Sequence, residues 1–461
     1  MSKTRILHDS LGEVAVPAGA LYGAQTQRAA NNFCISNQRL QPVFIHALAS
    51  IKRAAAQTNN ELGLIPREMA DAISDAATVI ENGRHSDQFV VDVFQTGSGT
   101  STNMNMNEVI ATLASRALHG DVHPNDHVNL GQSSNDVIPT ALRISSVIEA
   151  GTTLIPALDE LADAIDQAAA RNRDVIKTGR THLMDAMPIR VSDELGGWAA
   201  QVRQARQRID SARINLAALP LGGTAVGTGI NTHPDFAEKT IARLERHYNA
   251  GFHPVENRFA AISSQDDALA FSGELRGSAT VLLKIANDLR WMNSGPVSGL
   301  AEITLPALQP GSSIMPGKVN PVIPEAAAMA AAQVIGYDSA ISVAAQSGNF
   351  QLNVMQPLVA FNLLAAIGLL ARSAIHLDTS CIARIEFNAA ALRDKLGRNA
   401  MLITALAPVI GYEKAADVSK QVAASNRPVI DVAEELTDIS REKLLRLLDA
   451  ARLADGGIID E

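Results

Sequence analysis

The stretch EAAAMAAAQVIGYDSAISVAA, residues 325–345, decides the fold class of this chain of 461 residues. Its only charged residues are Glu325 and Asp338, and alanine is the strongest helix former. A helix that is apolar on nearly all sides is normally buried all round, in the core of a bundle or in an interface between subunits. The stretch therefore predicts a long helix that is covered by other helices or by other subunits.

Other segments repeat apolar residues at intervals of three and four, the spacing of one helix face. They are Leu158, Leu161, Ile165 and Ala168, and further on Leu275, Ala279, Leu282, Ala286 and Leu289. The apolar run 358–371 is interrupted by Asn362; it is too short to span a bilayer and suits a buried helix. Aromatic residues make up only 4% of the chain, which disfavours strands. We therefore expect a mainly α protein.

The two ends of the chain differ from its middle. The first part carries more turn-forming residues, and prolines and a glycine divide the tail into short helices. We expect an N-terminal mixed, mostly helical domain over residues 1–137, a central bundle of long helices over 138–395, and a small C-terminal helical domain over 396–461.

Charge and cysteine usage exclude several classes of protein. The net charge of −9 disfavours a general nucleic-acid-binding protein, so we expect no nucleic-acid partner. Cys34 and Cys381 are the only cysteines, too few for a disulfide framework or for the usual ligands of an iron–sulfur cluster. The start MSKTRILHDSLGEV shows no apolar leader. These observations predict a cytoplasmic protein without a membrane partner.

Four polar segments rich in small residues interrupt the apolar chain. They are GSGTSTNMNMN (97–107), HPNDHVNLGQSSND (123–136), TGRTHLMDAMP (178–188) and PGSSIMPGKVNP (310–321). Their hydroxyls, amides and exposed backbone N–H groups suit a carboxylate or phosphate. Any one alone indicates a surface turn. The four together, with His182 and Lys318 among them, favour an anion-binding site.

His119, His123 and His127 are spaced by four, which on a helix would align three metal ligands. Gly120 and Pro124 should break that helix, so we expect no metal site there. The segment GGTAVGTG (222–229) lacks dinucleotide-binding spacing, and we expect it to turn the chain between helices.

Glu325 follows Pro324 and begins the uncharged helix. Two interpretations stay open. The carboxylate could simply stabilise the positive end of the helix dipole, or it could orient a histidine.

These segments resemble the fumarase–aspartase superfamily. GSSIMPGKVNP (311–321) is similar to its signature loop, a long motif that is rarely matched by chance. The resemblance extends over nearly the whole chain, from GEVAVPAGALYGAQTQRA (12–29) through IANDLRWMNSGP (285–296) to IGYEKAADV (410–418). Within the superfamily the chain is most similar to the class II fumarases.

The resemblance implies a three-domain helical fold whose central helices form a twenty-helix core in a homotetramer. Each active site would be shared between three subunits. The implied reaction is the reversible hydration of a small dicarboxylate, fumarate, to L-malate by anti addition of water through an aci-carboxylate, without a cofactor or a metal.

Residue roles follow from the same resemblance. Ser312 matches the general base, and His182, backed by Glu325, matches the pair that handles the hydroxyl proton. The matched substrate-binding residues are Ser98, Gly99, Thr100, Ser133, Ser134, Asn135, Thr181, Ser313, Lys318, Val319 and Asn320. The matched accessory anion site consists of His123, Pro124, Asn125 and Asp126.

Some positions depart from the family pattern. Ala260 and the pair Ser192–Asp193 differ from the usual residues, and His127 is more typical of aspartases. Two alternatives therefore stay open: an aspartate ammonia-lyase and a structural relative without activity. Hydration is favoured, because hydroxide is a poor leaving group that needs a general acid, which His182 with Glu325 can supply.

Overall fold

The computed structural model describes residues 4–457, and helices make up most of this length. The chain divides into two compact units, each made of separate segments. Unit 1 comprises Met1–Pro156, Ala205–Ala279 and Ala330–Ala371. Unit 2 comprises Ala157–Gln204, Thr280–Met329 and Arg372–Glu461.

Each limit between the two units falls inside a long helix, so the chain passes from one unit to the other within regular structure. The division into three domains stays a prediction. Residue 137 lies in α5 (Ser134–Glu149), and residue 395 lies in α13 (Ala389–Gly397).

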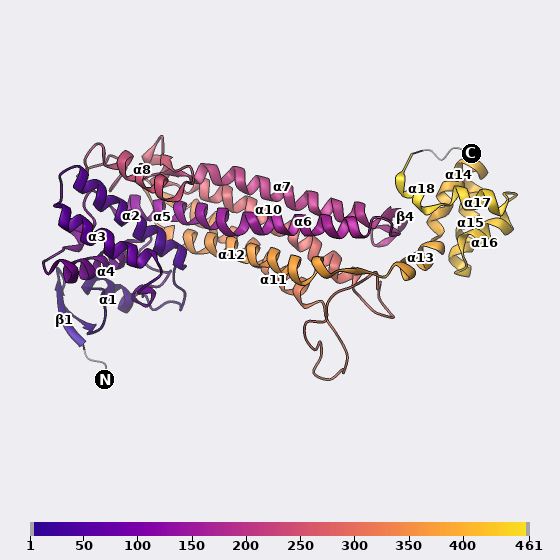
Figure 1. The fold of residues 1–461 in the computed structure, drawn as a ribbon, viewed down its shortest axis with the longest axis horizontal. Helices are drawn as coiled ribbons and strands as arrows, with labels where there is room; N and C mark the ends of the chain where they lie inside the picture. The colour runs from indigo at the N-terminus through magenta and orange to yellow at the C-terminus, as the bar shows by residue number, and fades with distance from the viewer. Residues whose placement is uncertain (1–3, 458–461) are drawn as a thin grey trace. The chain divides into compact units, whose positions relative to one another are not determined.

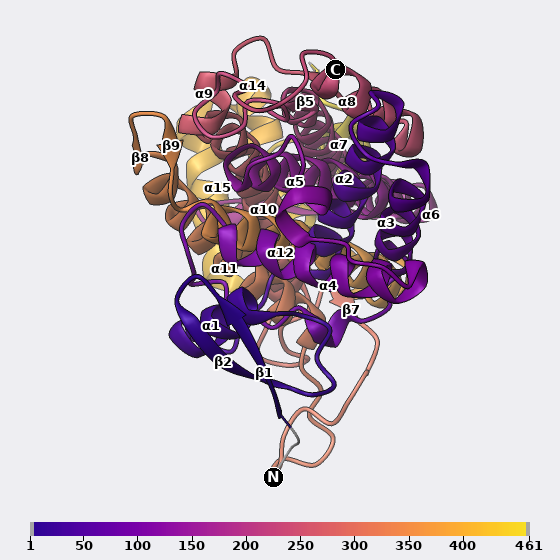
Figure 2. The same ribbon diagram turned by 90° about the vertical axis from the view of Figure 1, so that its left-hand side faces the viewer.

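Unit 1 begins with an antiparallel hairpin that contacts the first helix. β1 (Thr4–Asp9) pairs with β2 (Gly12–Pro17), and both contact α1 (Ala24–Asn32) (Figure 2). Glu108 of α4 (Thr100–Leu118) accepts hydrogen bonds from three backbone N–H groups at the start of α1. A carboxylate there satisfies N–H groups that have no partner within the helix.

α2 (Pro42–Glu61) is the central helix of unit 1. It contacts α3 (Arg67–Glu81), α4, α5 and α8 (Phe236–Tyr248) (Figure 1). Many of its residues are buried, the larger apolar ones being Phe44, Ile45, Leu48 and Ile51. Further elements of unit 1 are α9 (Arg258–Ser263), the parallel pair β5 (Ala218–Leu219) and β6 (His253–Pro254), and the pair β8 (Gly348–Asn349) and β9 (Leu352–Asn353).

Four long helices contain the predicted helical stretches: α6 (Ile155–Arg171), α10 (Asp266–Met292), α11 (Val322–Ala345) and α12 (Gln356–Ser380). Another long helix is α7 (Val191–Leu216). The stripe that begins at Leu158 lies on α6, the stripe that begins at Leu275 lies on α10, and every residue of both is buried. These two predictions are confirmed.

α11 is not covered on every side within the chain. Only 28% of its apolar window is buried within the chain, and the side chains of Met329 and Val343 are 69% and 57% exposed. The alternative that other helices of the same chain cover this helix on all sides is therefore wrong. The alternative, an interface between subunits, stays a prediction.

Within residues 4–457, two helical stretches, Val322–Ala345 and Gln356–Arg384, are long and apolar enough to cross a membrane by length and composition alone. Core helices of soluble proteins meet the same test. In the second stretch 67% of the apolar window is buried in the chain. The prediction that residues 358–371 form a buried helix is confirmed.

Unit 2 contains a separate hydrophobic cluster near the C-terminus. Its short helices include α15 (Tyr412–Ser425), and α14 to α17 gather together (Figure 1). Their core contains Leu406, Val422 and Leu444. This confirms the expected short helices after residue 396. The others are α14 (Ala407–Ile410), α16 (Val429–Leu436), α17 (Arg441–Leu447) and α18 (Ala450–Asp455).

Candidate active site

The segment GSGT lies at the start of α4, in unit 1. Gly99 has a positive φ of 72° and precedes the first helical residue, Thr100. Ser98 Oγ and Thr100 Oγ1 lie 2.8 Å apart within hydrogen-bonding distance. The rest of the polar run is helical rather than a turn: Asn103 to Asn107 are buried in α4. The start of this segment therefore offers hydroxyls at the positive end of a helix.

Ser133, Ser134 and Asn135 lie at the start of α5. The Ser133 hydroxyl accepts a hydrogen bond from Asn135 N at 3.2 Å, and Ser133 N donates to Asp136 Oδ1 at 2.9 Å. Asn103 Nδ2 donates to Ser134 Oγ at 3.0 Å. The structure thus brings the predicted residues of 98–100 and 133–135 together at two adjoining helix N-termini, an arrangement that favours anions.

The predicted accessory residues form a single turn, Pro124–Val128, that precedes α5. His123 Nδ1 accepts a hydrogen bond from Asp126 N at 3.2 Å, while His123 N donates to His127 Nδ1 at 2.9 Å. Asn125 and Asp126 line a cavity of about 510 Å³ together with Ser133. Asn125 and Asp126 therefore line the same cavity as one predicted substrate-binding residue. The assignment of residues 123–126 to an accessory anion site stays a prediction.

Thr181 and His182 lie in unit 2, at the tip of a hairpin between β3 (Ile176–Thr181) and β4 (Met184–Arg190). Thr181 pairs with Met184, so His182 and Leu183 are the two turn residues, with φ of 56° and 62°. Such turns usually contain glycine or asparagine, and other residues there are strained. His182 is exposed at this turn.

A charged network lies beneath this hairpin. Glu302 is 1% exposed, and its Oε1 accepts a hydrogen bond from Arg180 Nη1 at 2.6 Å. Lys177 Nζ lies 2.5 Å from Glu302 Oε2, close in distance but outside hydrogen-bond geometry, and donates to Glu194 Oε2 at 2.9 Å. β3 is thereby fixed to residues from α7 and from the segment after α10.

The signature loop is closed by contacts among its own residues. Gly311 N donates to the Lys318 carbonyl at 2.7 Å, and Asn320 Nδ2 donates to the Gly311 carbonyl at 2.8 Å. Ser312 Oγ accepts hydrogen bonds from the backbone N–H groups of Ile314 and Met315, at 3.2 and 3.0 Å. Residues 313–319 are exposed. The closed base of the loop therefore fixes the surroundings of the Ser312 hydroxyl.

Part of this loop and the start of α11 line a cavity of about 780 Å³ in unit 2. The predicted residues that line it are Lys318, Val319, Asn320 and Glu325. Glu325 lies in the first turn of α11, as expected. Asn287 and Arg290 line the same cavity and were missed at the sequence level, although both lie in the segment IANDLRWMNSGP. Arg290 and Lys318 are two cations that line the same cavity, which makes it suited to a carboxylate.

The predicted residues fall into two sets, one in each unit. Residues 98–100, 123–126 and 133–135 belong to unit 1, whereas 181–182 and 312–325 belong to unit 2. Among residues 4–457, no hydrogen bond or ion pair joins His182 to Glu325 within one chain. The pairing of these two residues stays a prediction.

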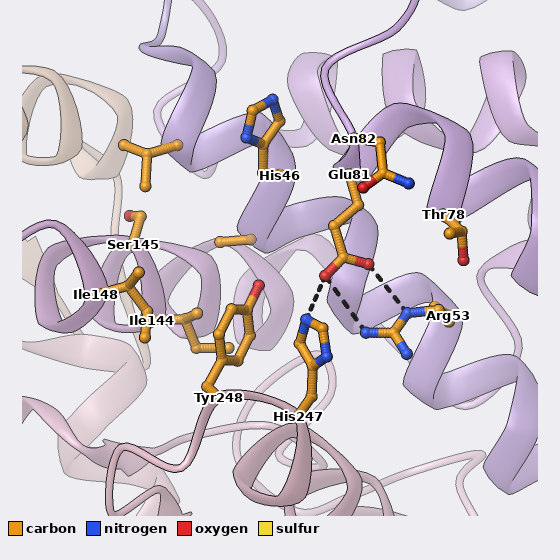
Figure 3. Close-up of a pocket in the computed structure, with 12 residues that line it drawn as sticks. His46, Arg53, Thr78, Glu81, Asn82, Ile144, Ser145, Ile148, His247 and Tyr248 are labelled. Carbon is orange, nitrogen blue, oxygen red and sulfur yellow. Dashed lines mark hydrogen bonds and ion pairs between the residues drawn. The ribbon is translucent and has the colours of Figure 1, made fainter. Parts of the chain in front are cut away.

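Another cavity, of about 420 Å³, lies in unit 1 and contains none of the predicted site residues (Figure 3). Glu81 accepts a hydrogen bond from Arg53 Nε at 3.0 Å and lies 2.5 Å from His247 Nε2. Burial lowers the pKa of His46 and raises the pKa of Tyr248 to about 12. The charge of the carboxylate is matched by its neighbours, so we assign no chemistry to this cavity.

Comparisons with known proteins show the family to which the chain belongs. Residues 12–336 match the lyase family, and residues 402–455 match the family of the fumarase C C-terminus. The chain is 57% identical over 458 residues to fumarate hydratase class II 2 of Pseudomonas aeruginosa, which covers 99% of this chain and 100% of that protein. It is 53% identical over 454 residues to fumarate hydratase class II of Xylella fastidiosa, covering 98% and 96% of the two chains.

Among solved structures, the recombinant class II fumarase of Schistosoma mansoni superposes with a TM-score of 0.94 at 38% identity, covering 98% of this chain and 99% of that one. The fold and the matched sequence define an enzyme of the lyase class. Within that class, the chain belongs to the class II fumarate hydratase family. The expected mainly α, fumarase-like fold is confirmed.

Proposed function

We propose that the chain catalyses the reversible hydration of fumarate to L-malate. Its relatives at 57% and 53% identity are named fumarate hydratases, and the residues that the resemblance assigns to substrate are present. In the malate-to-fumarate direction a base removes a proton from C3, and the neighbouring carboxylate becomes a doubly charged aci-carboxylate. The hydroxyl then leaves as water from the opposite face.

The surroundings of Ser312 are the observation that carries the proposal. A serine is a poor base at neutral pH, because the neutral hydroxyl binds a proton weakly and the strongly basic alkoxide is scarcely populated. Two backbone N–H groups, of Ile314 and Met315, donate to Ser312 Oγ at 3.2 and 3.0 Å. Hydrogen bonds that favour the charged form lower the cost of forming an alkoxide. Ser312 is therefore suited to take the C3 proton and to return it in the reverse direction.

The charge that develops on the substrate needs donors already in place. Hydrogen-bond donors aimed at developing charge accelerate a reaction more than donors that bind the ground state equally well. Lys318 and Asn320 supply a cation and an amide, and the helix starts at Thr100 and Ser134 supply hydroxyls at positive helix ends. Together with the other matched residues, these groups would bind the two carboxylates.

We assign to His182 the transfer of a proton to and from the hydroxyl group of the substrate. Glu325 is assigned as the residue that orients the His182 ring. A histidine can act as a general acid and base near neutral pH, and a carboxylate behind it fixes the ring. The strained turn that carries His182 supports a functional position, because strain of this kind persists where the surrounding structure enforces it.

We propose that the enzyme is a homotetramer with active sites shared between three subunits. The open face of α11, with Met329 and Val343 exposed, is apolar surface that another subunit would cover. Leu183 and Met184, beside His182, are both 70% exposed. A hairpin tip with an apolar surface around a catalytic histidine suits insertion against a neighbouring chain, which would bring the second half of the site.

We propose further that the enzyme needs no metal and works in the cytoplasm. Two cysteines, Cys34 and Cys381, cannot supply the usual ligands of an iron–sulfur cluster, and free thiols suit a reducing compartment. Activity that a strong chelator abolishes and added metal restores would contradict the first statement. Activity confined to another cell fraction would contradict the second.

The assay follows the ultraviolet absorbance of fumarate with purified enzyme, in buffer alone and then with ammonium. We expect malate formation to exceed aspartate formation by far; the opposite result would make the enzyme an aspartate ammonia-lyase, and no turnover in either arm would make it a structural relative.

Ser312→Ala should lower kcat by about 10²–10⁴-fold, the usual range for loss of a general base. Ser425→Ala, an exposed hydroxyl in the C-terminal helices, is the matched control.

A normal kcat in Ser312→Ala would overturn the assignment of the base. His182→Asn should slow malate dehydration strongly, since the departing hydroxyl then lacks its acid. Parent-like dehydration in that variant would remove His182 from the mechanism while leaving the substrate assignment intact.

A further inference from the structure

Lys52 is a fully buried amine that is hydrogen-bonded to the segment leading into Ser133–Asn135. It is 0% exposed in the middle of α2. Its Nζ donates to Asn129 Oδ1 and to Gln132 Oε1, each at 3.0 Å. Burying an amine is costly unless partners are present, so these two acceptors account for its position. Both acceptors lie in the short segment that leads directly into Ser133.

Asn129 is the point at which three elements meet. Its Oδ1 accepts hydrogen bonds from Lys52 and also from Asn103 Nδ2 and Asn107 Nδ2, both at 3.1 Å. Its Nδ2 donates to the Gln132 carbonyl at 3.1 Å. Asn103 Nδ2 also donates to Ser134 Oγ. A continuous chain of hydrogen bonds therefore leads from Lys52 to a hydroxyl of the substrate-binding set.

The far side of the same segment is fixed by a buried carboxylate. Asp136 is 0% exposed, and its Oδ2 accepts hydrogen bonds from the backbone N–H groups of Gly222 and Thr224, at 2.8 and 3.0 Å. Asn135 Nδ2 donates to the Ala225 carbonyl at 2.8 Å. Residues 129–136 are thus held by hydrogen bonds to the buried amine of Lys52 and by hydrogen bonds to the loop 222–225.

We propose that Lys52 is a positioning residue for substrate binding, which it serves by holding residues 129–136 in place through Asn129 and Gln132. The inference rests on the proposed function, since it concerns the residues assigned to the substrate carboxylates. Lys52 touches no substrate itself. Its effect is to fix the hydroxyls and amide of Ser133–Asn135 before substrate arrives, which lowers the entropic cost of binding.

Lys52 can hold the segment in either protonation state. Burial lowers the pKa of this amine to about 7, and the nearby Asp136 charge opposes that shift. An ammonium has three N–H donors and a neutral amine has two, so either form can satisfy the two amide acceptors. The hydrogen bonds, rather than the charge, hold the segment.

The test replaces Lys52 by methionine, which keeps the length of the side chain and removes its donors. Lys52→Met should raise KM for fumarate and for malate about tenfold, the factor produced by losing about 1.4 kcal/mol of hydrogen bonding, and should leave kcat nearly unchanged. Arg143→Met is the control: this buried cation on α5 is 3% exposed and contacts Asp267 and Ala218 but not residues 129–136.

Hydrogen exchange gives a second measurement that needs no turnover. The backbone N–H groups of residues 129–136 should exchange faster in Lys52→Met than in the parent, while Arg143→Met leaves them unchanged. A parent without fumarate turnover would refute the proposed function, but the exchange result would still test the role of Lys52. Unchanged exchange at 129–136, or a KM within twofold of the parent, would overturn the inference. So would an equal rise of KM in both variants.

A milder pair of variants covers the case in which Lys52→Met fails to fold. Gln132→Leu removes one of the two acceptors, whereas Gln132→Glu keeps an oxygen for Lys52. We expect a higher KM in the leucine variant and a KM closer to that of the parent in the glutamate variant. Equal KM values for the two variants would refute the positioning role.

Discussion

The buried carboxylate of Glu302 should decide whether the His182 hairpin keeps its shape. Glu302→Ala removes the group that lies against both Lys177 and Arg180. Breaking a buried ion pair by removing one partner typically costs about 3–5 kcal/mol, because the remaining charge stays buried without a partner. The structure favours the lower end of that range. Lys177 keeps Glu194 at 2.9 Å, and Arg180 is 19% exposed and can turn toward solvent.

We therefore expect Glu302→Ala to reduce the free energy of unfolding by about 3 kcal/mol. Glu302→Gln should cost less, because the amide oxygen still accepts a hydrogen bond from one of the two cations, although the other cation then faces the NH2 group. Glu386→Ala is the control: it removes an exposed carboxylate on β10 (Glu386–Phe387), which pairs with β7 (Ile303–Thr304), and should change stability by about 0.5 kcal/mol or less.

The measurement is urea unfolding followed by circular dichroism, at one fixed chain concentration because subunit assembly contributes to apparent stability. The turnover number provides a second readout. Since the network fixes β3, which ends at Thr181, its loss should also lower kcat for malate dehydration. A urea midpoint for Glu302→Ala that equals that of Glu386→Ala would refute the reasoning. It would show that the two cations find equivalent partners without Glu302.

Other perturbations test the geometry elsewhere. A Cβ on Gly97 would lie 1.6 Å from the Val354 carbonyl oxygen, so Gly97→Ala must shift backbone at the start of the GSGT segment. Urea unfolding should show that this variant loses stability toward the upper end of about 1–3 kcal/mol. Gly120→Ala should be neutral, because the nearest atoms to its added Cβ lie 3.9 Å away, at ordinary van der Waals distance. Burial raises the pKa of the Cys381 thiol to about 12, so this thiol stays protonated at pH 8. A thiol reagent should therefore label one cysteine per native chain, the exposed Cys34, and two cysteines per chain in denaturant. Labelling of both cysteines in the native enzyme would contradict the burial of Cys381.

The helical stripes could be predicted from sequence because burial of one helix face leaves a direct trace in residue spacing. Leu161, Ile165 and Leu282 are buried as their intervals indicate. α11 shows the limit of that rule. Its composition indicates that neighbours must cover it, but composition does not say whether those neighbours belong to the same chain. Met329 and Val343 are left open by this chain.

Local propensity failed where tertiary partners override it. The run GSGTSTNMNMN is rich in residues that favour turns, yet most of it is helical, because the Asn103 and Asn107 side chains donate hydrogen bonds to Asn129 Oδ1 inside unit 1. The hairpin tip was missed for the opposite reason. A two-residue turn is normally marked by asparagine or glycine, and here His182 and Leu183 adopt positive φ without that signal.

Some residues of the candidate site could be predicted from the sequence, and others could be found only from the structure. Residues such as Ser312 and Lys318 were found because they lie within a long motif whose spelling resembles a family. Lys52 could not be found in this way: in SIKRAAA it resembles any helix-surface lysine, and only the packing of α2 against α4 and α5 reveals that it is buried. Groups that touch substrate are constrained by chemistry and leave a motif. Groups that position them are constrained by packing. A buried positioning lysine therefore cannot be distinguished in the sequence from a lysine on the surface of a helix.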